Sequence, residues 1–179
     1  MAGTLYGTTE KGGSQGCGRE SNYNDCGTVF SVTTSGTESV LHTFTGPDGS
    51  NPDAALINVD GTLYGTTAKG GVHPCGCGTV FSITTGGTEN VAYSFNGHHH
   101  PNTPLGGLLD AGGTLYGTTY GGGGHGEGTV FSMTPGDRLK VLHNFGQKGT
   151  GWNRWPRPPG RAGRGKGHVL RHDGSWWSV

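Results

Sequence analysis

Three copies of one short motif constrain the fold of this chain more than any other feature. The motif GTLYGTT occupies residues 3–9, 61–67 and 113–119. A second motif, GTVFSxT, follows each copy at residues 27–33, 78–84 and 128–134, and a third motif ends in phenylalanine at residues 44, 95 and 145. The second and third motifs recur every 50 or 51 residues, so length varies only in the loop between the first and second motifs. A period near 50 is typical of propeller blades and solenoid repeats.

The composition favours strands over helices. Glycine accounts for 39 of the 179 residues, and the apolar residues come in short alternating runs rather than at a spacing of 3.6. Each motif predicts one strand, a fourth strand is expected at Ala54–Val59, and Asp60-Gly61 predicts a tight hairpin after it. We therefore expect an all-β chain of tandem four-stranded repeats that form a partial β-propeller-like array.

The predicted domains are three repeats and a tail. The repeats span about residues 3–53, 54–104 and 105–147. Propellers close with about four to eight blades, so three repeats predict open blade edges and a possible homo-oligomer through them.

Residues 148–179 have a different composition. They carry seven of the twelve Lys and Arg residues and all four tryptophans. Read one nucleotide late, codons for His168–Ser178 can encode TFYGTTxxGG, and the tryptophan codons force the two final glycines. We expect a basic tail that is translated out of frame, is disordered and has no evolved function. Its Arg and Trp residues suit nucleic acid, but an out-of-frame origin disfavours that partner.

The motif order GTLYGTTxxGG, GTVFSxT, VLHxF and DGxxPxAxL resembles the Gloeo/Verruco (GloVer) repeat of bacterial proteins, over residues 3–146. The resemblance implies an exported or cell-surface propeller-like or solenoid array of unknown biochemical role. We expect no signal peptide, because Met1 lies almost directly on the first motif, and no membrane span, because the sequence has no apolar run long enough for one.

The four cysteines all lie in the variable loop between the first and second motifs. They are Cys17, Cys26, Cys75 and Cys77. One interpretation is a four-thiolate metal site with His73, although the spacings are not those of standard zinc sites. The favoured alternative is loop disulfides, with Cys17–Cys26 the easiest pair.

Histidines and an acidic turn give further candidate sites. His42 and His143 share one repeat position, which Tyr93 occupies in the second repeat, and are expected to be partly buried. The run His98–His100 suggests either a metal site or a solvated loop. Asp48, Asn51 and Asp53 are candidate calcium ligands, although a plain Asx turn explains the same residues.

No acid, base and nucleophile set is evident in the sequence. Ser14 lies in a G-x-S-x-G pattern, but no helix follows it as a nucleophile elbow requires. We expect a non-catalytic, surface-type module that displays loops for a small molecule, a carbohydrate or a surface partner. The alternative is a calcium-dependent hydrolase that opens lactones, such as acyl-homoserine lactones, with His42, His143 and Ser14 as candidate catalytic residues.

Overall fold

The computed structural model describes residues 3–13, 26–97, 100–136, 138–146, 168–170 and 176–178. These residues contain strands and turns but no helix, which confirms the all-β prediction. No described segment therefore offers a long apolar helix that could cross a membrane. Residues 1–147 form one compact unit and residues 148–179 form a second.

The first unit contains three antiparallel sheets, one for each sequence repeat. The first sheet is β1 (Thr4–Thr9), β2 (Thr28–Thr33) and β3 (Glu38–Thr43). The second is β4 (Ile57–Val59), β5 (Thr62–Thr67), β6 (Thr79–Thr84) and β7 (Glu89–Ser94). The third is β8 (Leu109–Ala111), β9 (Thr114–Thr119), β10 (Thr129–Met133) and β11 (Lys140–Asn144). Within each sheet, every strand pairs with its neighbours in sequence.

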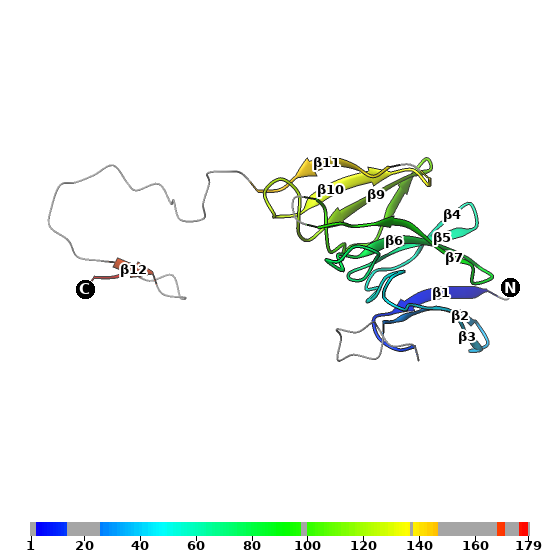
Figure 1. The fold of residues 1–179 in the computed structure, drawn as a ribbon. Helices are drawn as coiled ribbons and strands as arrows, with labels where there is room; N and C mark the ends of the chain where they lie inside the picture. Colours follow the sequence, from blue (N-terminus) through cyan, green and yellow to red (C-terminus); the bar gives the residue numbers. More distant parts are fainter. Residues whose placement is uncertain are drawn as a thin grey trace. The chain divides into compact units, whose positions relative to one another are not determined.

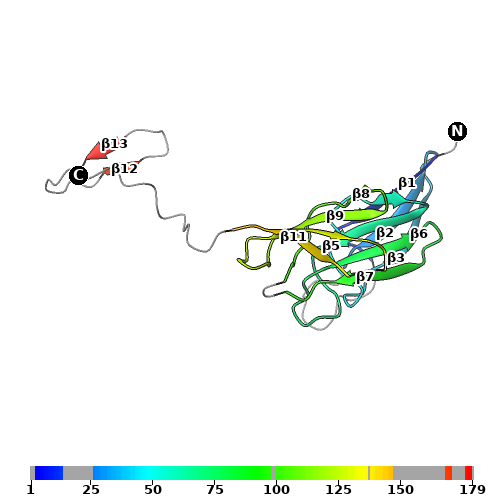
Figure 2. The ribbon, with the colours of Figure 1, turned by 90° about the horizontal axis from the view of Figure 1, so that it is seen from above.

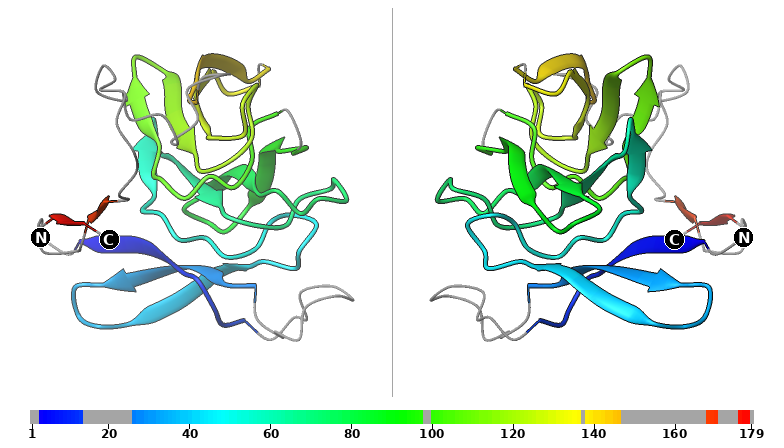
Figure 3. Two further views of the ribbon diagram at one scale, coloured as in Figure 1. Left: turned by 90° about the vertical axis from the view of Figure 1, so that its left-hand side faces the viewer. Right: turned by 90° about the vertical axis from the view of Figure 1, so that its right-hand side faces the viewer.

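The three sheets stack as layers in sequence order (Figure 1; Figure 3). Seen from above, their strands overlie one another (Figure 2). One core cluster joins the first two sheets and includes Phe44, Leu63 and Phe81. A second core cluster joins the second and third sheets and includes Phe95 and Phe131. The phenylalanines that end the third motifs of the first and second repeats, Phe44 and Phe95, are therefore buried by the sheet that follows.

Two features of the first and second motifs explain why they recur together. Gly65 lies opposite Phe81 in the β5–β6 pair, so the glycine leaves room for the ring. Gly78 has a φ of 95°, and a side chain there would collide with the carbonyl of Thr67. Since positive φ favours glycine, the opening residue of GTVFSxT is fixed by backbone geometry.

The two ends of each sheet differ. At one end the connections are tight: Asp60 and Gly61 have φ values of 49° and 85°. Positive φ at both central residues is typical of a type I′ hairpin, which confirms the predicted turn. At the other end lie the long loop between the first and second motifs and the turn that follows the third motif.

The second unit contains β12 (His168–Leu170), which pairs antiparallel with β13 (Trp176–Ser178). These two strands lie within the tail for which the sequence predicts disorder. The remaining residues of that tail are outside the described part of the chain.

Candidate functional site

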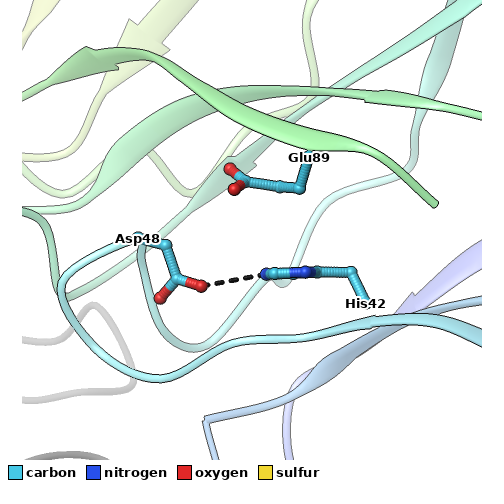
Figure 4. A group of neighbouring side chains, drawn as sticks. All are labelled: His42, Asp48 and Glu89. Atoms are coloured by element: carbon cyan, nitrogen blue, oxygen red, sulfur yellow. Dashed lines mark hydrogen bonds and ion pairs between the residues drawn. The ribbon is translucent and has the colours of Figure 1, made fainter.

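Three ionisable side chains from two repeats meet at the junction of the first and second sheets (Figure 4). His42 lies near the end of β3, Asp48 lies on the turn after β3, and Glu89 is the first residue of β7. The Nε2 atom of His42 is 2.9 Å from Oδ2 of Asp48. One potential ligand atom from each side chain lies within 4.8 Å of the other two. We call these three residues the junction triad.

Local hydrogen bonds fix Asp48 in the triad. Its Oδ1 atom accepts bonds from the N–H of Thr45 at 2.8 Å and from the Thr45 hydroxyl at 3.0 Å. Its backbone carbonyl accepts a bond from the Thr79 hydroxyl at 3.2 Å, which ties the turn to the second sheet. Burial alone would raise the pKa of Asp48, but the hydrogen bonds from His42 and Thr45 outweigh it and hold the pKa below its ordinary value. The carboxylate is therefore favoured in its charged form.

The ring of His42 is oriented by an aromatic neighbour. It meets Phe44 edge to face, with ring centroids 4.9 Å apart and an interplanar angle of 86°. Its partner across the β2–β3 pair is Val29, next to a register shift that all three sheets share. Packing against Phe44 thus directs Nε2 toward Asp48.

Glu89 is the least satisfied member of the triad. Its Oε1 atom is buried and has no hydrogen-bond partner. Burial raises the pKa of Glu89 to about 6; the charge of His42 acts in the opposite direction and that of Asp48 in the same direction. This half-buried carboxylate therefore has an oxygen, Oε1, that is available to a proton or a cation.

The next junction of the stack shows that the triad is not needed for stacking. Strand register places Tyr93 opposite Val80, as His42 lies opposite Val29. The same register relates Leu139 to Glu89. In the third sheet Ser132 pairs with Lys140, and Leu139 precedes Lys140. In the second sheet the equivalent Ser82 pairs with Asn90, and Glu89 precedes Asn90. Both Tyr93 and Leu139 pack against the hydrophobic core. The same sheet-on-sheet contact is therefore apolar in one junction and ionisable in the other.

Comparison with known families agrees with this repeat architecture. The chain matches the Gloeobacter/Verrucomicrobia repeat over residues 1–157. It belongs to this family. The match confirms the resemblance found in the sequence motifs, which covers residues 3–146, and extends beyond it at both ends. No curated protein and no solved structure matches the chain.

In this Gloeobacter/Verrucomicrobia repeat chain, the predicted calcium ligands have different surroundings. Asp48 faces His42, whereas the Asn51 side-chain amide donates to the Glu10 carbonyl at 3.5 Å. Burial, with the nearby charge of Glu10, raises the pKa of the exposed Asp53. Among the described residues, Asp48 and Asp53 share no group of three His, Cys, Asp or Glu ligands.

The two equivalent histidines have different surroundings. His42 is partly buried as predicted, with 21% of its side chain exposed. His143 packs edge to face on Phe145, with centroids 4.8 Å apart, but it is exposed. The predicted partial burial of His143 is therefore wrong, because no described sheet covers the third repeat as the second covers the first.

Three cysteines take part in disulfides. Cys75 and Cys77 are joined to each other, and Cys26 is also disulfide-bonded. Cys17, the predicted partner of Cys26, lies outside the described residues, as do Ser14, His98 and His99. His73 and His100 are exposed.

Glu89 is the triad residue that the sequence analysis did not single out. Its repeat position carries Glu38 in the first repeat and Leu139 in the third, so the repeat does not require an acid there. Alignment of the three repeats on their strand register, rather than on their motifs, would have pointed to this position.

Proposed function

We propose that this Gloeobacter/Verrucomicrobia repeat chain is a non-catalytic module that displays loops for binding. The observation that carries the proposal is a loop edge (residues 45–53, 68–78, 100–104 and 120–128) that continues from repeat to repeat. Ser50 and Lys69 exchange backbone hydrogen bonds of 2.8 and 3.0 Å, and Asn102 and Gly121 exchange bonds of 3.1 and 3.2 Å. The turn that follows the third motif of one repeat is thus hydrogen-bonded to the loop between the first and second motifs of the next repeat.

The side chains on the loop edge suit contact with a ligand. Val72 is 71% exposed and Tyr120 is 76% exposed. Both belong to the segment whose length varies between repeats, while the strands beneath keep their sequence. Rigid scaffolds with variable loops are a common basis for binding, and an exposed tyrosine offers a flat apolar face together with a hydroxyl.

Carbohydrate is the ligand class that an exposed aromatic ring on this edge favours. The test is co-sedimentation of the full chain with cellulose, chitin and peptidoglycan, each as an insoluble probe. We expect retention on at least one, and a fall of at least fivefold for Tyr120→Ala. Leu109→Ala is the matched control, since Leu109 is 66% exposed but lies on β8 and outside the loop edge.

Two results would contradict this function. Absence of retention on every probe would remove the carbohydrate class, and equal retention of Tyr120→Ala and Leu109→Ala would remove the loop edge as the surface. Ring opening of an acyl-homoserine lactone by the full chain, dependent on added calcium, would favour the hydrolase alternative instead. That alternative stays a prediction.

A further inference from the structure

We propose that the junction triad, His42, Asp48 and Glu89, binds a divalent transition-metal ion of the zinc type between the first and second repeats. The site goes beyond the proposed loop-edge function and does not depend on it. It would add a metal link between two repeats that apolar packing, backbone hydrogen bonds and threonine hydroxyls already join.

The donor set indicates the class of ion. One imidazole nitrogen and two carboxylates are ligands that zinc and its neighbours accept, whereas calcium prefers six to eight oxygens. Ligand atoms about 2.0–2.2 Å from a tetrahedral zinc lie roughly 3.3–3.6 Å from one another. The 2.9 Å pair of His42 and Asp48 and the overall limit of 4.8 Å bracket that spacing. Moving the His42 and Asp48 atoms slightly apart and rotating the Glu89 side chain would bring all three atoms to one ion, and the proton that Nε2 of His42 shares with Asp48 would move to Nδ1 or to solvent.

The supporting contacts are those expected around a metal ligand. Thr45 donates two hydrogen bonds to Oδ1 of Asp48, which leaves Oδ2 directed at the triad. Phe44 holds the His42 ring edge to face. Groups that orient the direct ligands raise the metal affinity of a site. Two of the three ligands are thus fixed before an ion arrives.

The buried Oε1 atom of Glu89 is a second, independent observation. It has no hydrogen-bond partner, although a buried polar atom without one is destabilising. The corresponding residue at the next junction, Leu139, packs on the core without this penalty. A cation between the three side chains would give Oε1 a partner and would explain an acid at this position.

The test is a zinc titration of the full chain by isothermal calorimetry, after treatment with a chelator and without reducing agent so that the disulfides remain. We expect Glu89→Gln, which keeps the shape of the side chain, to weaken zinc binding at least tenfold. Calcium in place of zinc should bind the unaltered chain at least tenfold more weakly.

A double variant guards against loss of the fold. His42→Tyr with Glu89→Leu copies the residues Tyr93 and Leu139 of the next junction, so its sheets should still stack. We expect this variant to unfold cooperatively but to lose the thermal stabilisation by zinc that the unaltered chain shows. His143→Tyr changes the equivalent histidine outside the triad and should leave zinc binding unchanged.

Zinc held by the histidine run must be separated from zinc held by the triad. All titrations are therefore repeated in chains that carry His98→Ser, His99→Ser and His100→Ser. Unchanged zinc affinity in both Glu89→Gln and the double variant would overturn the proposal. So would failure of the unaltered chain to bind zinc at millimolar concentration.

Discussion

Gly65 and Phe81 lie opposite each other on the paired strands β5 and β6, and the ring occupies the space beside the glycine. A Cβ atom at Gly65 would lie 2.6 Å from Cζ of Phe81. The equivalent pairs, Gly7 with Phe30 and Gly117 with Phe131, share this register. The inner glycine of each GTLYGTT and the phenylalanine of each GTVFSxT are therefore one structural unit.

The first prediction concerns Gly65→Ala. The added methyl group should displace the Phe81 ring and lower the free energy of unfolding by about 1–3 kcal/mol, the usual effect of overpacking a core. Urea unfolding followed by circular dichroism measures the loss. Gly86→Ala is the control, because its Cβ would have no heavy atom nearer than 3.8 Å, and we expect a change within about 0.5 kcal/mol. Equal losses in the two variants would show that the pairing with Phe81 has no special role.

This glycine pair shows which parts of the fold the sequence could predict. Alternation of polar and apolar residues and the repeated motifs predicted the strands and their order within each sheet, because both depend on neighbours in the chain. The contact of Gly65 with Phe81 requires the register between two strands. How consecutive sheets pack, and therefore whether the array resembles a propeller, depends on side chains from different repeats and was not predictable from periodicity.

The candidate site also contains residues that the sequence could indicate and one that it could not. His42 and Asp48 were singled out from their residue types, but as a repeat-position histidine and a calcium ligand rather than as partners. Glu89 was missed because it comes from the next repeat and has no motif of its own. The misjudged burial of His143 has the same origin, since its exposure depends on what stacks on the third sheet.

A second prediction concerns the buried hydroxyl pair of Thr67 and Thr79, whose oxygens are 2.8 Å apart. The Thr67 hydroxyl oxygen also accepts the Thr79 N–H at 3.0 Å. Thr67→Val should leave that N–H without a partner and lower the free energy of unfolding by about 1–3 kcal/mol. Thr67→Ser keeps the hydroxyl and should lose less in the same urea experiment. A valine variant as stable as the serine variant would contradict the role of the hydroxyl.

The raised pKa of Glu89 predicts a pH dependence of stability in the presence of a chelator. The pKa is about 6 in the folded chain against an ordinary 4.5, so the folded state binds more protons between these values. Stability should therefore fall as pH rises from 4.5 to 6. Because the side chain is only half buried, solvent screening reduces the effect to about 1 kcal/mol. The lowered pKa of Asp48 places its titration below this window.

Glu89→Gln isolates that contribution, since the amide does not titrate. In chelator, the variant should be more stable than the unaltered chain at neutral pH, and the difference should disappear near pH 4.5. Glu38→Gln is the matched control, because Glu38 holds the same strand position in the first sheet but is exposed. A constant difference at every pH would show that the carboxylate of Glu89 keeps its ordinary pKa.

The outer faces of the stack predict self-association. Phe44 and Phe95 are fully buried by the following sheet, whereas the equivalent Phe145 is 45% exposed. On the opposite side, Leu5 is 64% exposed, although the equivalent Leu63 is 3% exposed. The third sheet of one copy thus presents the residue that the first sheet of another copy would cover.

We expect a concentration-dependent increase in mass by sedimentation velocity, which Phe145→Ser and Leu5→Ser should each reduce. Val72→Ser removes an apolar side chain that is 71% exposed on the loop edge and should leave the association unchanged. A monomer at every concentration, or equal effects of all three variants, would show that the stacking faces do not pair between copies.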